Sequence, residues 1–410
     1  MSLIYTSDGS VRCPFSLLLG DLLPSRPTPH PTERMRAAAY GEHGPVDAVV
    51  VAEVPLPVPA PGQVLVRVAG AGVHPVDVKL RAHRLPDIYF PKPKIPGTDF
   101  SGTVVDASKG GGRFEEGDPV FGMLPLLGAT WGSAAEYVAV DERAIARAPS
   151  SIPLEDAAAL PTPALAVLQA LRAVEAEAGG SRKLKGRWAL VQAGAGSVGS
   201  FAVQYLANHL GMRVVATCSG ANLEFVRGLG AEVAIDYTAE RFEERLGKGQ
   251  VAVVIDPLGD VYEARTFKAG ILAPGAHYVH MAAAPWGYAA RAAGPLHLST
   301  PEARPDRVAW GLAKAAASRA FWRFRYHYVA VRPDAEGLGR VALLVDSGEA
   351  RPQIQQALPL GGVRAAHLLI EGGHTRGSIV LAMDEAAAGR GRWSAEKEAQ
   401  ARRSRVSGGG

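Results

Sequence analysis

The sequence predicts an α/β protein with two domains, a small partly open β-barrel and a doubly wound parallel sheet. The chain has 410 residues and is 47% hydrophobic, which is enough for two cores. Short stretches between residues 46 and 140 alternate apolar and polar residues between prolines and glycines, as half-buried strands do. From residue 187 onward, apolar strands alternate with segments of helical periodicity, which is typical of a parallel sheet covered by helices.

The barrel is expected to begin near Met35 and to consist of short strands. Prolines at every second position from 55 to 61 exclude a helix there and separate the first two strands. Residues 154–174 are rich in Ala and Leu and have helical periodicity, which Pro161 and Pro163 interrupt. The barrel strands are expected at 46–54, 62–73, 95–107 and 117–123.

The parallel sheet is expected to follow, with helices at 197–210 and 222–230 between its first strands. Residues 337–354 predict a helix that stops at Gly348 and leads into a strand, and residues 378–383 predict a last strand. The strands of the parallel sheet are expected at 187–192, 213–218, 232–237, 251–256 and 277–281.

A further strand is indicated by FWRFRYHYV (321–329), in which aromatic rings alternate with Arg323, Arg325 and His327. This alternation is typical of a strand with one face in water. The rings are expected to pack in the core or at a subunit contact. A quinone slot or a lipid-facing surface is the alternative, and the latter would allow peripheral membrane association.

The stretch VQAGAGSVGSFAVQYL (191–206) places three glycines between the first strand and the first helix of the parallel sheet. In this context a GxGxxG pattern indicates dinucleotide binding rather than a merely structural turn. Gly194 allows the tight turn, Gly196 lets a pyrophosphate approach the main chain, and Gly199 lets the helix pack close to the strand. The N–H groups at the helix start, at Ser197 and Val198, then face the anion.

The end of the second strand predicts NADPH rather than NADH. An Asp or Glu there would bind the adenosine ribose 2′-hydroxyl and repel a 2′-phosphate, and none is present. Ser219 and Asn222 can instead donate hydrogen bonds to a phosphate, and Tyr237 ends the next strand nearby. Arg227 is the nearest cation in the sequence.

Composition argues against several other classes of protein. Two cysteines, Cys13 and Cys218, cannot build a disulfide framework or a Cys-rich zinc module. No apolar run reaches the about 18 residues of a membrane helix. Basic residues outnumber acidic ones by only 44 to 40, and much of the excess lies in a disordered basic tail at 385–410, so nucleic acid is not expected as a ligand. Residues 1–34 are expected to be a leader or a disordered extension.

Several segments resemble the medium-chain dehydrogenase/reductase superfamily over about residues 35–383, and its zinc-independent quinone oxidoreductase branch in particular. Residues 324–354 are similar to the mitochondrial reticulon-interacting NADPH oxidoreductases of this branch. The segments that carry the resemblance to the branch are AGVHPVDVKLR (71–81), PGTDFSGTV (96–104), GSAAEYVAV (132–140), AAALPTPALAVLQAL (157–171), LGAEVAIDY (229–237) and EGGHTRGSIVL (371–381).

The resemblance implies a GroES-like catalytic domain from residues 35–159 and 338–384, and a Rossmann NADPH-binding domain from residues 160–337. Zinc-dependent relatives have a catalytic Cys where Val73 and His74 stand, so no metal ligands are expected in this chain. By the same resemblance, Leu258 and Met281, at the ends of parallel strands, line the nicotinamide together with His74.

The expected chemistry is hydride transfer from NADPH to a quinone or another activated carbonyl acceptor, such as an enone. Negative charge then builds up on the acceptor oxygen, and His74 could donate a hydrogen bond or a proton to it. The alternative is a histidine that lines the cleft without a chemical role. Two other functions stay open, reduction of an enoyl thioester and a nucleotide-binding partner protein with little turnover. The relatives suggest a homodimer and a mitochondrial location, with chloroplast or cytoplasm as alternatives.

Overall fold

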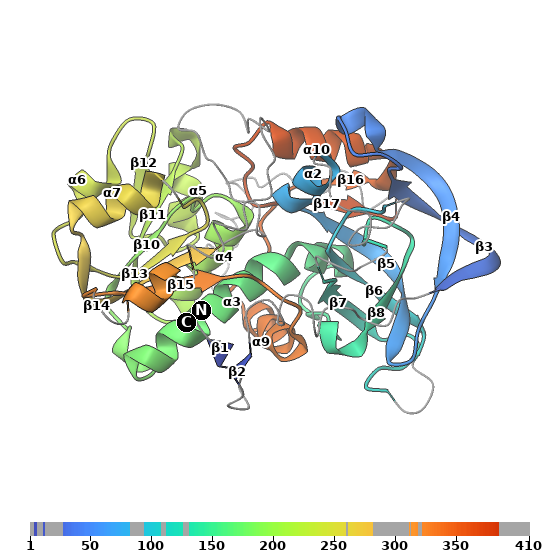
Figure 1. Cartoon of the computed structure of the whole chain (residues 1–410), viewed down its shortest axis with the longest axis horizontal. Coiled ribbons are helices and arrows are strands. Elements are labelled where there is room, and N and C mark those ends of the chain that lie inside the picture. The colour runs from blue at the N-terminus through green and yellow to red at the C-terminus, as the bar shows by residue number, and fades with distance from the viewer. Residues whose placement is uncertain are drawn as a thin grey trace, which may run out of the picture.

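Two sheets and a helix between them organise the molecule in the computed structural model (Figure 1). A parallel sheet with its helices lies on the left of the view, and a mainly antiparallel barrel sheet lies on the right. Helix α3 (Pro161–Ala178) lies between them. The structure describes residues 4–5, 11–12, 28–82, 94–107, 112–125, 131–259, 261–281, 311, 313–318 and 322–384.

The parallel sheet has six strands in the order β12-β11-β10-β13-β14-β15. Counted along the chain, this is the order 3-2-1-4-5-6 of a Rossmann sheet, which reverses between β10 and β13. Ligands of such sheets bind outside the carboxyl ends of the strands at this reversal. The strands are β10 (Trp188–Val191), β11 (Arg213–Cys218), β12 (Val233–Asp236), β13 (Val251–Asp256), β14 (Leu272–Met281) and β15 (Arg325–Val329).

Helices join these strands and bury them. All six residues of β13 are buried, so both faces of the sheet centre are covered and both are apolar. The connecting helices are α4 (Ser197–Gln204), which continues as a π-helical turn to His209, α5 (Leu223–Gly228), α6 (Phe242–Arg245) and α7 (Val261–Ala269).

The barrel sheet contains strands from both ends of the chain. Strand β17 pairs antiparallel with β5, so residues 379–382 lie beside residues 70–73. The sheet order is β16-β17-β5-β6-β7-β9, and β8 also pairs with β5. Its strands are β5 (Gln63–Val73), β6 (Asp99–Asp106), β7 (Pro119–Met123), β8 (Tyr137–Asp141), β9 (Ile145–Arg147), β16 (Ile354–Pro359) and β17 (Ser378–Ala382). The predicted fold class is confirmed, whereas the domain boundaries at 159/160 and 337/338 remain predictions.

Three helices pack on this frame. Helices α2 (Pro75–Ala82) and α10 (Val363–Glu371) contact each other, and α9 (Ala335–Asp346) contacts α3 and β9. Pro161 does not break α3 but begins it, because the first turn of a helix needs no N–H donor for its own hydrogen bonds. Helix α3 ends at Gly179, whose φ of 80° is left-handed.

Ordered structure begins before Met35, the expected domain start. Strand β3 (Thr28–Ala39) pairs with β4 (Val50–Val58), and its pairing reaches back to Thr28 opposite Val58. The expected separation of strands by the prolines was also wrong, since Pro55 and Pro57 lie within β4. Proline excludes a helix but is tolerated in edge strands such as these. A short pair, β1 (Ile4–Tyr5) and β2 (Val11–Arg12), lies within the expected leader; the rest of residues 1–27 and the tail at 385–410 lie outside the described residues.

The prediction of a wet face on β15 was wrong for His327, which is only 7% exposed. Helix α3 contacts both β14 and β15, and it covers the face on which His327 lies. On the opposite face, Tyr326 packs against Phe267, Tyr278 and Trp322. The aromatic side chains are therefore part of the core, which was one of the two expected positions for them. Phe321 lies outside the described residues.

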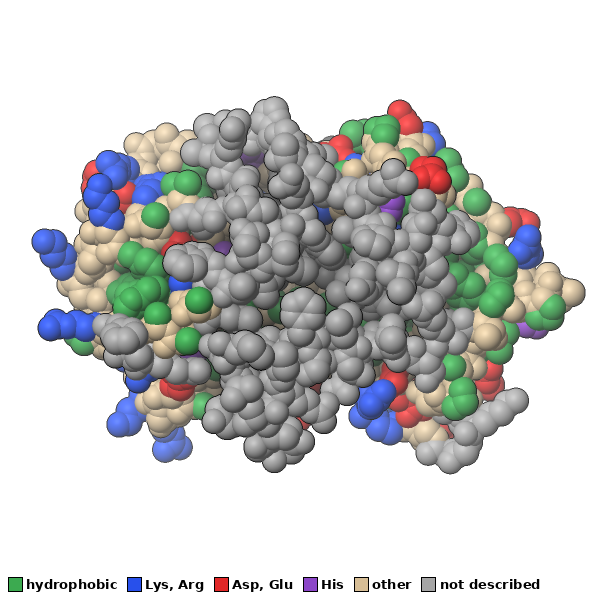
Figure 2. All heavy atoms as spheres, viewed as in Figure 1, with side chains coloured by type: hydrophobic (Ala, Val, Ile, Leu, Met, Phe, Trp, Pro, Cys, Tyr) green, Lys and Arg blue, Asp and Glu red, His purple; other side chains and the backbone are tan. Residues whose placement is uncertain are grey.

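Charges of both signs are mixed on the surface. In Figure 2, Lys and Arg side chains lie beside Asp and Glu side chains at several places along the rim. Several of these charges form ion pairs, such as Arg213 with Glu232 and Arg143 with Asp141. In the part of the chain that the structure describes, no helix combines the length and hydrophobicity of a membrane span.

Candidate nucleotide-binding and active site

The glycine turn connects β10 to α4 at the point where the parallel sheet reverses its order. Ala193 has a left-handed conformation with a φ of 53°, which turns the chain sharply. Two hydrogen bonds anchor the turn to β11: Gly194 N donates to Thr217 O at 2.8 Å, and Ala193 N donates to Thr217 Oγ1 at 3.1 Å. The turn is therefore held rigidly by the neighbouring strand.

The N-terminus of α4 points its main-chain donors out of this turn. The first hydrogen bond of the helix runs from Ser200 N to Gly196 O at 2.8 Å. The N–H groups of Ser197, Val198 and Gly199 precede that bond, so they are the donors that a helix start offers to an anion. The structure thus places the predicted donors at the carboxyl edge of the sheet.

The three glycines differ in what surrounds them. A Cβ at Gly199 would lie 2.1 Å from Ala193 O, and one at Gly194 would lie 2.8 Å from the Ala216 side chain. A side chain at either position would therefore force the surrounding structure to shift and would destabilise the fold. A Cβ at Gly196 would meet only Ala193 O, at an ordinary 3.5 Å. The fold therefore leaves space over Gly196.

Ser219, Asn222 and Tyr237 come together at the ends of β11 and β12. Asn222 Nδ2 donates to Ser219 Oγ at 3.0 Å, and Tyr237 N donates to Cys218 O at 3.1 Å. The Tyr237 side chain is 37% exposed. The three residues that the sequence predicted to bind the adenosine half of the coenzyme therefore lie together at one edge of the sheet.

Arg376 is a cation at this edge that the sequence analysis missed. Its Nε donates to Asn222 Oδ1 at 2.8 Å, and its Nη2 donates to Ala221 O at 3.3 Å. Its guanidinium also lies 5.3 Å from the centre of the Phe225 ring. Arg227, the cation that the sequence suggested, is exposed and forms an ion pair with Glu224 instead.

The segment before β17 brings Arg376 to this place. Gly377 N donates to Ala195 O at 2.8 Å, and Gly196 and Gly377 form an isolated parallel bridge. A Cβ at Gly377 would lie 2.0 Å from Gln353 O, so only glycine fits there. The glycine-rich segment EGGHTRGS (371–378) is the sequence signal that accompanies Arg376. It does not show by itself that the segment contacts the glycine turn, which is far away in the chain.

One carboxylate does lie near the adenosine edge. Asp236, the last residue of β12, accepts hydrogen bonds from Thr238 N at 3.0 Å and from Thr238 Oγ1 at 2.7 Å. It also accepts one from the main chain of Gly220, and these hydrogen bonds hold the pKa of Asp236 below its ordinary value. The carboxylate thus organises the loops after β11 and β12.

Leu258 lies two residues after the end of β13, and Met281 is the last residue of β14. The two strands pair in parallel up to Asp256 and His280. Asp256 Oδ1 accepts from Leu258 N and from the next main-chain N–H, both at 2.8 Å, and its Oδ2 accepts from the Tyr278 hydroxyl. Met281 is 6% exposed and Leu258 is half-buried. Both residues therefore lie at the carboxyl edge of the sheet, and the buried carboxylate of Asp256 fixes the loop that carries Leu258.

His74 is buried at the end of β5 and binds a carboxylate. Its Nε2 lies 2.8 Å from Asp99 Oδ2, and Asp99 also accepts from Thr162 N at 2.7 Å and from the Thr162 hydroxyl. Asp77 accepts from the main chain of His74 at 2.7 Å and of Gly97 at 3.0 Å. The imidazole is thus oriented by one carboxylate, and its loop is fixed by a second.

The two carboxylates determine the charge state of His74. Burial alone lowers the pKa of the imidazole, but the negative charges of Asp99 and Asp77 outweigh it, and the pKa lies above its ordinary value of 6.5. His74 is therefore a buried group that can hold a proton near neutral pH.

A small pocket is lined in part by Asp77. Tyr40, Asp77, Lys94 and Thr98 contribute its polar groups. Burial lowers the pKa of Lys94 to about 7, although Asp77 acts in the opposite direction. An amine with such a pKa can exchange a proton at neutral pH, and the sequence did not single out Lys94.

Comparison with known proteins places the chain in a family. The model of the alcohol dehydrogenase GroES-like domain matches residues 60–150, and the model described as zinc-binding dehydrogenase matches residues 229–381. The mitochondrial NAD(P)H oxidoreductase RTN4IP1 of Mus musculus is 30% identical over 348 residues, which are 78% of this chain and 82% of that protein. The chain belongs to the medium-chain dehydrogenase/reductase family, in its quinone oxidoreductase branch.

Other members of this family match in sequence or in structure. A chloroplastic NADPH-dependent alkenal/one oxidoreductase of Arabidopsis thaliana is 37% identical over 234 residues, which are 55% of this chain and 58% of that protein. The chain therefore spans less than two thirds of that relative. The quinone oxidoreductase structure from Coxiella burnetii is 26% identical, with a TM-score of 0.68, and the match covers 86% of this chain and 100% of that one.

The charge state of His74 in this family member can be tested through stability. Because the pKa is raised in the folded state, protonated His74 stabilises the fold fully below a pH of about 6.5, and this contribution is lost as the pH rises through the folded-state pKa. The parent should therefore lose its stability advantage over His74→Asn progressively as the pH rises above about 6.5, measured as the free energy of unfolding in urea. A difference that stays constant or grows with pH would contradict the raised pKa.

Proposed function

We propose that this chain is an NADPH-dependent oxidoreductase that transfers hydride to a quinone or another activated carbonyl acceptor. The space over Gly196 carries the proposal, because the fold does not need glycine there but a bound pyrophosphate does. The helix start at Ser197 supplies the donors and the positive end of the helix dipole beside that space.

The preference for NADPH rests on Arg376. An adenosine 2′-phosphate bound at Ser219 and Asn222 would lie beside its guanidinium, and Arg pairs well with phosphate. Asp236 is nearby, but its hydrogen bonds with Thr238 direct it to the protein's own loops. Family membership supports a nicotinamide coenzyme, and this arrangement favours the phosphorylated form.

The chemistry divides between the coenzyme and the chain. NADPH supplies the hydride when it is bound. The main-chain donors of α4 and the guanidinium of Arg376 would hold its phosphates, which orients the nicotinamide toward Leu258 and Met281. His74 would stabilise the negative charge on the acceptor oxygen; because its Nε2 faces Asp99, a proton for that oxygen would come from Nδ1.

We propose that the reaction needs no metal ion. His74 is bonded to Asp99 and Asp77, and these two carboxylates also accept hydrogen bonds from Thr162 and from the main chain of Gly97. Among the described residues, no cysteine lies in this neighbourhood, since Cys218 is on β11 of the other sheet. A zinc site of the usual N and S ligands would therefore have to be built from side chains that hold the loop together.

Reduction of the carbon–carbon double bond of an enone is a second candidate reaction. The Arabidopsis relative is named an alkenal/one oxidoreductase, and the same placement of coenzyme and His74 would serve hydride addition to either acceptor. Enoyl thioesters are acceptors of the same electronic type. A nucleotide-binding partner protein with little turnover is the third reading.

Replacement of Gly196 tests the pyrophosphate site. Gly196→Val should abolish measurable NADPH binding and leave the protein folded, because its side chain would fill the coenzyme's space and meet little of the protein. Gly199→Ala is the matched control: its Cβ would be forced against Ala193 O, so it should cost roughly 1–3 kcal/mol of stability. Equal NADPH affinity in Gly196→Val and the parent, measured by fluorescence titration, would place the pyrophosphate elsewhere.

Replacement of Arg376 tests the coenzyme preference. Arg376→Gln should weaken NADPH binding by about 10- to 100-fold, because that is the affinity usually lost with one hydrogen bond to a charged group. NADH binding should be unchanged. Arg227→Gln removes an exposed Arg on α5 and should change neither affinity. An equal loss for both coenzymes in Arg376→Gln would mean that Arg376 does not recognise the 2′-phosphate.

Turnover tests the reaction. The near-ultraviolet absorbance of NADPH should fall when quinones or enones are added, and pretreatment with EDTA should leave the rate unchanged. A faster fall of the NADPH absorbance with enoyl thioesters than with any quinone would favour an enoyl-thioester reductase. Tight NADPH binding without turnover of any acceptor would favour the partner protein. A loss of rate that zinc restores, in EDTA-treated protein that is still folded at the assay temperature, would contradict the metal-free reaction.

We also propose that the protein works in mitochondria. The mouse relative is mitochondrial by name, although the Arabidopsis relative is chloroplastic. Residues 1–34 fused to a fluorescent protein should direct it to mitochondria. Import into plastids, or a diffuse cytoplasmic signal, would contradict this assignment.

A further inference from the structure

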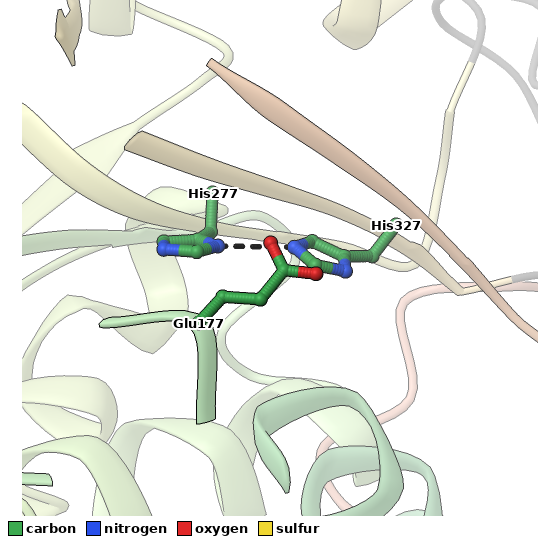
Figure 3. Close-up of side chains that lie close together, drawn as sticks. All are labelled: Glu177, His277 and His327. Atoms are coloured by element: carbon green, nitrogen blue, oxygen red, sulfur yellow. Dashed lines mark hydrogen bonds between the residues drawn. The ribbon is translucent and has the colours of Figure 1, made fainter. Parts of the chain in front are cut away.

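A second cluster of chemically active side chains lies on the parallel sheet, away from the glycine turn (Figure 3). It consists of Glu177 near the end of α3, His277 on β14 and His327 on β15. Each side chain offers one ligand atom, and these three atoms lie within 4.8 Å of one another. In the ranges that the structure describes, no other three His, Cys, Asp or Glu side chains have ligand atoms this close together.

The strand register brings the two histidines together. Strands β14 and β15 are parallel neighbours, with His277 opposite Arg325 and Val279 opposite His327. The two histidines are thus two residues apart in register and lie on the same face of the sheet. They are 4% and 7% exposed, and their rings stack with centroids 5.3 Å apart. Glu177 reaches the same point from helix α3, which covers this face; in Figure 3 its side chain points up toward the two rings.

The spacing of the ring nitrogens is close to the spacing that a metal ion requires. His277 Nδ1 and His327 Nε2 are 3.0 Å apart and share a hydrogen bond. Two nitrogen ligands of a tetrahedral zinc ion lie about 3.3 Å apart, so small ring movements would suffice. On binding, the shared proton would move to the other nitrogen of its own ring, and both lone pairs would then point at the ion.

We propose that Glu177, His277 and His327 bind a divalent transition-metal ion, with zinc as the natural occupant. Two imidazoles and a carboxylate suit zinc and its neighbours in the periodic table, whereas Mg²⁺ and Ca²⁺ prefer all-oxygen sites. Glu177 is exposed, so water can complete the coordination. The sequence analysis expected no metal ligands, and it could not detect this group because its members come from three separate elements.

The site is independent of the proposed hydride chemistry. His277 lies four residues before Met281 on β14, about 13 Å along the strand from the carboxyl edge of the sheet. A metal ion here would tie α3 to the last two strands of the sheet, and its effect should be on stability. Arg325 is its competitor, because Arg325 Nε lies 3.7 Å from Glu177 Oε2 and its charge would repel a cation.

Titration of chelator-treated full-length protein with Zn²⁺ by calorimetry tests the proposal. The parent should bind one zinc ion at this site, and Glu177→Gln and His327→Gln should each weaken that binding at least about tenfold. Arg325→Gln should strengthen it, since it removes a competing cation. His209→Gln is the control, because His209 pairs with Glu349 at 2.7 Å on the surface and should not contribute. Mg²⁺ should not compete.

Thermal unfolding and Co²⁺ spectra complete the test. Zn²⁺ should raise the Tm of the parent and of His209→Gln, but not that of Glu177→Gln at the same concentration. Because Glu177 is exposed, its variant should fold even if a histidine variant does not. Zinc affinity in Glu177→Gln equal to that of the parent, or a Co²⁺ spectrum with a thiolate band, would overturn the proposal.

Discussion

The contact between the glycine turn and the segment before β17 determines how the candidate site is assembled. Gly377 N donates to Ala195 O, and only glycine fits at position 377. Since β17 pairs with β5, this contact joins the barrel sheet to the phosphate end of the parallel sheet. It also places Arg376 beside Asn222, so the proposed coenzyme site uses residues of both sheets.

Buried carboxylates position the polar groups of the site. Asp99 connects His74 on the barrel to Thr162 at the start of α3, the helix between the two sheets. Asp256 fixes the loop at Leu258 with its two main-chain hydrogen bonds. Each of these carboxylates is fully buried, where an unpaired charge would be costly, so its partners are held firmly. The site is therefore rigid before any ligand binds.

Local signals in the sequence predicted much of this site, and long-range contacts account for what was missed. The positions of Gly194, Gly196 and Gly199 follow from a strand, a tight turn and a helix that are adjacent in the chain. The place of Arg376 beside Asn222 could not be predicted, because its position depends on the return of the chain to β5. His327 is buried because α3 covers its face of the sheet. The alternation of aromatic and basic residues along β15 cannot show whether a distant helix covers one face of the strand. The early start of β3 was hidden because residues before Met35 are polar and exposed and lack a hydrophobic pattern.

A crystal structure of the protein with NADPH tests the central claim most directly. The pyrophosphate should lie over Gly196 against the main-chain donors of α4, and the adenosine 2′-phosphate should contact Arg376. A coenzyme bound elsewhere, or one whose 2′-phosphate faces away from Arg376 while the contact between residues 195 and 377 persists, would contradict it.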